Sequence, residues 1–165
     1  MKIKNMQDLL IYELRDLYSA ETQIVKALPK VIQHVTSPEL GQALEAHLEE
    51  TKNHVTRLEE AIKRLDAGSP KGQTCKGMQG VLEEGEEAFK EAPAGELLDA
   101  AIISACQRVE HYEMAGYGSA RSFAEQLGLE KVVKLLQETL DEEGAADKKL
   151  TSLSKATNRQ AAAVR

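Results

Sequence analysis

The chain has 165 residues, of which 42% are hydrophobic and 29% are charged, and its formal net charge is −6. This length supports one domain with a single core, and the acidic balance provides no positive field that would attract nucleic acid or an anionic membrane. The start of the chain, MKIKNMQDLLIYELRD, contains acidic residues too early for a signal peptide, and no apolar stretch reaches the length of a bilayer span.

The first predicted helix runs from about residue 5 or 6 to near His34. Apolar residues recur along it at heptad-like spacing and define one buried face, made of Leu10, Leu14, Leu17, Ile24 and Leu28. Glu21 falls within the same stripe. Pro29 removes a backbone donor late in this segment, so we expect it to kink the helix or to mark a last, offset turn.

The second predicted helix follows after a short link. The segment Thr36-Ser37-Pro38-Glu39 supplies an N-cap, a proline in the first position and an acidic first turn, which together are typical of a helix start. The predicted buried face consists of Leu40, Leu44, Leu48, Val55, Leu58, Ile62 and Leu65. The segment Gly68-Ser69-Pro70 should end this helix. Because the link is short, the first two helices should form an antiparallel hairpin.

The second half of the chain repeats this hairpin after a long connection. Residues 67–95 are rich in Gly and Lys, with a short helix expected at about 78–91. A third long helix should span about 96–127, with Gly128 as its C-cap, and a fourth should span about 130–153. We expect one domain over residues 1–155 and a frayed tail over 156–165. One long crossover between two hairpins predicts an all-α, ferritin-like four-helix bundle whose connection carries a short extra helix.

Ionisable side chains stand at or near core positions of every long helix. Glu21 interrupts the first apolar stripe, and Glu50 and His54 lie one turn apart beside the second. Glu110 and Glu113 share one face of the third helix because they are three residues apart. The fourth helix places two carboxylates, Glu143 and Asp147, between Leu140 and Leu150. The candidate ligands are therefore Glu21, Glu50, His54, Glu110, Glu113, Glu143 and Asp147.

Several carboxylates at one level of a bundle require neutralisation, because an unpaired buried anion is strongly destabilising. Two divalent ions, iron or manganese, are the expected cofactors, since hard oxygen donors with some imidazole suit these metals. Two alternatives stay open: His47 can pair with Glu50, and Glu142 replaces Glu143 if the last helix is rotated. Otherwise His47 and His111 are interpreted as surface residues or hydrogen-bonded structural residues.

Five segments in this order resemble the YciF-like stress proteins, a bacterial family with a ferritin-like fold and a layout related to rubrerythrins. They are DLYSAETQIVKALPK, AHLEETK, VEHYEMAGYGSAR, AEQLG and LLQETLDEEGAADKKL. The resemblance implies a homodimer, a metal centre and expression linked to osmotic, oxidative or envelope stress. By similarity to the rubrerythrin layout, Glu110 and Glu113 correspond to the helix with two glutamates, and Glu21, Glu50 and Glu143 to the single glutamates.

Two classes of function follow from these observations. The first is a non-haem protein with a dinuclear metal site that handles iron or peroxide, and the second is a non-enzymatic structural or interaction protein with one metal or none. DNA protection is a third idea that depends on the basic tail alone, and the acidic balance opposes it. Cys75 and Cys106 are isolated cysteines, which favours a reducing, cytoplasmic location.

Overall fold

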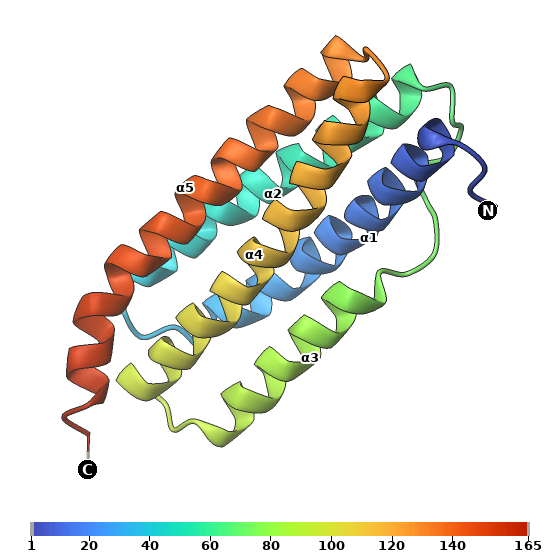
Figure 1. The fold of residues 1–165 in the computed structure, drawn as a ribbon. Helices are drawn as coiled ribbons and strands as arrows, with labels where there is room; N and C mark the ends of the chain where they lie inside the picture. The colour runs from blue at the N-terminus through green and yellow to red at the C-terminus, as the bar shows by residue number, and fades with distance from the viewer. Residues whose placement is uncertain (1, 165) are drawn as a thin grey trace.

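The structure is a computed structural model that describes residues 2–164, and over this range it contains five helices and no strand (Figure 1). The helices are α1 (Met6–Ile32), α2 (Pro38–Arg64), α3 (Lys76–Glu91), α4 (Glu96–Gln126) and α5 (Glu130–Ala161). The four longer helices lie side by side, and α3 packs on the outside against α4 and α1. The predicted all-helical bundle is therefore confirmed. None of the helices in residues 2–164 combines the length and the apolar character that crossing a membrane requires.

The starts of α1 and α2 are capped by side chains. The Asn5 side chain accepts a hydrogen bond of 2.8 Å from the Asp8 backbone N–H, and the Ser37 hydroxyl accepts one of 3.3 Å from Leu40. Pro38 occupies the first turn of α2, as its sequence predicts. At its other end α1 continues past Pro29 only to Ile32, two residues short of the predicted end at His34.

The loop between α1 and α2 is held by a buried carboxylate from a distant part of the chain. Asp99, on the first turn of α4, accepts hydrogen bonds of 2.8 Å from the backbone N–H groups of both Thr36 and Ser37. The sequence contains no local signal for this contact, because the partners are more than sixty residues apart. The contact joins the α1–α2 hairpin to the start of the second hairpin.

Helix α5 extends beyond its predicted end near Leu153 and reaches Ala161. Thr157 and Ala161 are buried, and they continue the spacing of seven and four residues that begins at Leu150. Residues 156–161 of the predicted tail are therefore the last turns of a helix. The prediction missed them because threonine and alanine give a weak apolar signal.

The core consists of two apolar clusters separated by a polar layer. One cluster includes Leu10, Leu14, Leu58, Ala120 and Leu136, where α1 begins and α2 ends. The other surrounds the opposite ends of the same helices and includes Ile24, Leu44, Ile102 and Leu150. Each long helix passes from one cluster to the other, and its buried ionisable residues lie at the crossing, apart from Asp99 at the start of α4. The bundle thereby places carboxylates from three helices and imidazoles from a fourth at one level.

Candidate metal centre

Six ionisable side chains in the polar layer are almost fully buried. Each of these residues is at most 6% exposed, and together they are Glu21, His47, His54, Glu110, Glu113 and Glu143. Among residues 2–164, no lysine or arginine is buried. Four carboxylates therefore share this layer with two imidazoles as the nearest potential cations.

The side chains form two groups that share one residue. In the first, Glu21, His54 and Glu143 bring one donor atom each within 4.8 Å of the others. His47, Glu110 and Glu143 do the same in the second. Because Glu143 belongs to both groups, its carboxylate lies between them.

The imidazoles approach the carboxylates closely. His54 Nδ1 lies 3.0 Å from Glu143 Oε1 and 3.3 Å from Glu21 Oε1, and His47 Nε2 lies 3.2 Å from Glu110 Oε1. These nitrogens are near the oxygens but are not aligned with them as hydrogen bonds within the described chain. Their arrangement around shared points suits coordination better than pairwise hydrogen bonding.

Many of the buried oxygens also lack a hydrogen-bond donor. Within residues 2–164, both oxygens of Glu113 and of Glu143, and one oxygen each of Glu21 and Glu110, have no such partner. Buried polar atoms are rarely left in this state, because each lost hydrogen bond to water destabilises the folded protein by about 1–3 kcal/mol. Carboxylate oxygens with imidazole nitrogens are the donor set that iron and manganese use in helical bundles, so these residues fit a dinuclear metal site.

Burial and mutual repulsion perturb the acid–base equilibria of the layer. Burial, reinforced by the neighbouring carboxylates, raises the pKa of Glu110 and of Glu113 well above the usual value. Burial alone would lower the pKa of His54, but its contacts with Glu143 and Glu21 outweigh it and raise this pKa to about 10. Burial likewise opposes ionisation of Glu143, yet the contacts with His54 and Glu110 hold its pKa below the usual value. Without metal, these shifts favour a charged His54 beside an ionised Glu143 and oppose the ionisation of Glu110 and Glu113.

A second ring of side chains orients the first. His54 Nε2 donates a hydrogen bond of 2.8 Å to Glu142, and Arg57 binds both oxygens of Glu142 at 2.5 and 2.9 Å. The Arg57 guanidinium holds the pKa of Glu142 below the usual value. On the other side, the Tyr117 hydroxyl donates to Glu21 Oε1. Such partners fix the tautomer and the orientation of residues that ligate metals.

Two of the candidate residues do not join the buried cluster. The Glu50 side chain is 46% exposed, and its Oε2 lies 3.7 Å from His47 Nδ1, at the margin of the site. Asp147 accepts a hydrogen bond of 3.0 Å from Gln107 and lies 3.4 Å from His111 Nε2. The structure thus brings together Glu21, His54, Glu110, Glu113 and Glu143, and Glu142 supports His54 from behind instead of replacing Glu143.

His47 is the cluster residue that the sequence interpretation assigned to the surface or to a structural role. It is buried because the inward face of α2 follows Leu40, Leu44, His47, Thr51, His54 and Leu58, at intervals of three and four residues. The predicted face used Leu48 and Val55, which are only half-buried. Following both histidines as part of the stripe would have identified the site. His111, in contrast, lies at the surface as expected, 67% exposed.

The chain is similar to known proteins over nearly its whole length. It is 43% identical to the protein YciF of Escherichia coli K12 over 154 residues, which cover 93% of each chain. The crystal structure of the E. coli stress protein YciF matches with a TM-score of 0.91 at 41% identity, covering 95% of this chain and 99% of that one. YcfI of Rhodopseudomonas palustris, presented as a candidate structural protein, matches with a TM-score of 0.87 at 44% identity and covers 91% of this chain and 95% of its own.

A more distant structure shows only that the fold is shared. The protein XCC3681 of Xanthomonas campestris has a TM-score of 0.72 at 20% identity, over 92% of each chain.

Residues 5–163 match the family model described as "Domain of unknown function (DUF892)". The chain therefore belongs to this family and is YciF-like.

Proposed function

We propose that this protein is a ferritin-like metalloprotein of the stress response whose bundle core holds two iron or manganese ions. One observation carries the proposal: six oxygens of four buried glutamates have no hydrogen-bond donor within residues 2–164. Cations shared between these oxygens would remove both the desolvation penalty and the mutual repulsion. The imidazoles of His47 and His54 complete the donor set.

The ligands divide into two sets in this proposal. Glu21 and His54 would hold one ion and His47 and Glu110 would hold the other, and Glu143, which belongs to both groups, would serve both. Glu113 is fully buried, has two oxygens without a donor and shares the inward face of α4 with Glu110, so it would be a further oxygen donor. The usual pattern of such bundles takes a Glu-x-x-His motif from each of two helices, whereas both histidines here come from α2.

Bound iron or manganese would supply redox chemistry toward oxygen or peroxide, which is the reaction class we assign to the site. The chain's own groups prepare the ligands for that role. Arg57 and Glu142 hold the Nε2 proton of His54, so that Nδ1 is the nitrogen directed to Glu21 and Glu143. Tyr117 restrains Glu21 by donating to one of its oxygens. The apolar clusters on both sides exclude bulk water.

We also propose that the protein is a cytoplasmic homodimer. A two-fold dimer is the commonest oligomer of soluble proteins, and a metal site within one bundle does not need the large shell of a ferritin. A second candidate function is a structural or interaction protein. It is favoured by the description of the R. palustris relative as a candidate structural protein. In that case the polar layer would bind one metal or none.

Elemental analysis of protein purified without chelator distinguishes the two functions. The metalloprotein should contain close to two iron or manganese ions per chain, and Glu143→Gln should lose both because Glu143 belongs to both ligand groups. Glu130→Gln is the matched control, since Glu130 is an exposed glutamate on the same helix, at its start and away from the polar layer. Unchanged metal content in Glu143→Gln, or a wild-type protein without metal after supplementation, would favour the structural role.

A further inference from the structure

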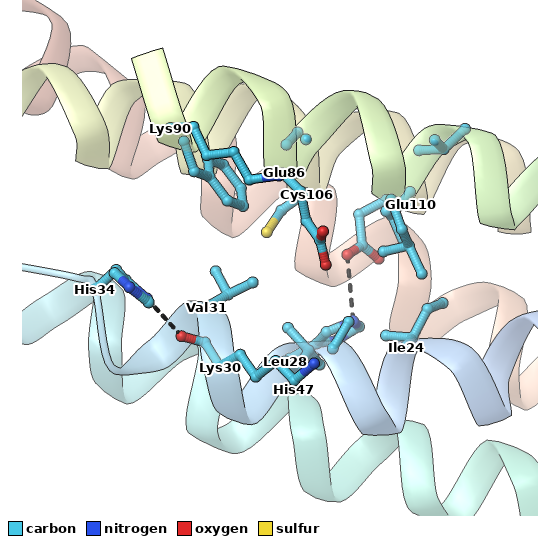
Figure 2. A pocket seen from close by; sticks show the side chains of 17 residues that line it. Ile24, Leu28, Lys30, Val31, His34, His47, Glu86, Lys90, Cys106 and Glu110 are labelled. Atoms are coloured by element: carbon cyan, nitrogen blue, oxygen red, sulfur yellow. Dashed lines mark hydrogen bonds and ion pairs between the residues drawn. The ribbon is translucent and has the colours of Figure 1, made fainter. Parts of the chain in front are cut away.

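A cavity of about 380 Å³ lies between α1, α3 and α4 and ends at the candidate metal centre (Figure 2). His47 and Glu110 line its inner end, and Figure 2 shows them joined by their ion-pair contact. The volume falls within the range of small-molecule sites, roughly 300–1,000 Å³. The cavity is thus large enough for an organic ligand and reaches the residues that we assign to one metal ion.

The walls between the surface and this inner end are mainly apolar. They include Ile24, Leu28 and Val31 from α1, Leu82 and Phe89 from α3, and Val109 from α4. Along α1 the lining extends from Ile24 to Val31, seven residues that correspond to about 10 Å of helix, and it continues to His34 in the turn that follows. The space is therefore elongated, and its walls suit a hydrocarbon chain better than a polar metabolite.

The outer end carries positive charge. Lys30, His34 and Lys90 line the cavity there and are exposed, with Glu86 as an acidic neighbour. His34 is held at this end by a hydrogen bond of 2.8 Å from its Nδ1 to the Lys30 carbonyl (Figure 2). On a chain with a net charge of −6, two lysines at the mouth of an apolar cavity favour an anionic head group.

We propose that this cavity binds an unbranched aliphatic carboxylate of medium chain length, with its carboxylate at Lys30 and Lys90 and its tail against His47 and Glu110. A helix from a second copy is about 10 Å across and exceeds a space of this volume. Binding itself needs no metal. The proposal rests on the proposed function only in assigning this ligand class as the substrate of the metal centre.

Calorimetric titration of the metal-free, full-length protein tests the head-group assignment. Decanoate should bind, decanol should bind more weakly, and decylamine should bind most weakly. Lys30→Glu combined with Lys90→Glu should weaken decanoate binding by about tenfold and reverse the order of decanoate and decylamine. Lys26→Glu, an exposed change of the same kind on α1, should have little effect. Equal affinity for decanoate and decylamine would overturn the proposal, as would the absence of decanoate binding.

A second pair of variants tests the location of the ligand. Ala27 lines the cavity and is half-buried, so Ala27→Phe should obstruct it and abolish decanoate binding, whereas Ala115→Phe, at an exposed site on α4, should not. If Ala27→Phe does not fold, nitrogen-15 shifts of the histidine side chains give the same information. Decanoate should then shift His47 and leave His111 unchanged. Decanoate binding that leaves the His47 signal unchanged would refute the assignment.

The outcomes separate this proposal from the proposed function. A protein that binds decanoate at His47 but never binds metal retains the ligand site and loses the metalloprotein function. A protein that binds two metals but no decanoate retains the function and loses the ligand site. If the cavity variants disrupt a dimer and leave decanoate binding unchanged, the cavity is an interface between copies and the proposal fails.

Discussion

The Nε2 atom of His54 lies 2.8 Å from Glu142 Oε2, on the opposite side of the ring from the Nδ1 atom that faces Glu21 and Glu143. Glu142 is in turn bound by Arg57 through both of its oxygens. The half-buried pair thus anchors a buried imidazole from behind. If His54 Nδ1 binds a metal ion, disturbing the Arg57–Glu142 pair should weaken metal binding.

Substituting Arg57 by Gln should weaken metal binding by about 10–100-fold, because Glu142 would no longer be held in position to orient His54. The protein should remain folded, since Arg57 lies at the edge of the site and not in the apolar clusters. Competition titrations with a chelator measure the affinity. Arg64→Gln is the control, because Arg64 pairs only with Glu60 at the surface in the described structure. Equal affinities of the two variants would show that the anchor has no effect on the site.

Substituting Glu113 by Gln should stabilise the metal-free protein while reducing its metal content. Burial raises the pKa of Glu113 in the folded state, so its contribution to stability is full below the unfolded pKa and is lost as the pH rises above it. Glutamine does not ionise, so the variant does not lose this part of the free energy of unfolding as the pH rises. Between about pH 5 and pH 8, the free energy of unfolding of the metal-free wild type should therefore fall more steeply than that of the variant. Urea titrations at several pH values measure both slopes, and parallel slopes would count against a buried, protonated Glu113.

The two cysteines should react slowly with alkylating agents in the native protein. Burial raises the pKa of Cys106 to about 12 and also raises that of Cys75, whose thiol lies 2.9 Å from Asp16 and 3.0 Å from the Tyr112 hydroxyl. Since the thiolate is the reactive form, iodoacetamide at pH 8 should label neither cysteine quickly, and both should react after denaturation. Rapid labelling of one thiol in the native state would contradict the packing around it.

Asp99 should be essential for the stability of the α1–α2 loop. Replacing it by Ala leaves two backbone N–H groups without their acceptor, and we expect a loss of about 3 kcal/mol in the free energy of unfolding. Asp99→Asn should lose less, because its carbonyl still accepts one of the two hydrogen bonds. Chemical denaturation provides the comparison, with Asp141→Ala, an exposed change on α5, as control. A loss no greater than that of the control would mean that the loop does not depend on this carboxylate.

Periodicity was sufficient to predict the helices and most of the polar layer. A glutamate that replaces leucine in an apolar stripe must face the core, and this reasoning correctly buried Glu21, Glu110, Glu113 and Glu143. It misassigned α2, where histidine and threonine take three successive core positions and leave no apolar signal. Glu50 lies one turn from His54, but its side chain projects from a different side of α2 and lies at the margin of the polar layer.

Contacts between distant segments could not be predicted from local patterns. The Asp99 contact and the cavity each depend on how the second half of the chain packs against the first. The place of α3 against α1 and α4 is an example, because its sequence indicates a short helix but not the surface it covers. Close packing of Gly116 against Leu17 likewise becomes explicable only in the fold, where an added Cβ would lie 2.8 Å from the leucine.

We propose that the polar layer holds two metal ions, one in the group of Glu21 and His54 and one in the group of His47 and Glu110, with Glu143 common to both groups. Anomalous scattering from crystals grown with iron or manganese, collected on both sides of the metal absorption edge, tests it most directly. We expect two peaks roughly 3.5–4 Å apart within the polar layer, both of them beside Glu143. An empty polar layer in protein supplied with metal, or peaks confined to exposed carboxylates such as Glu50 and Asp147, would contradict it.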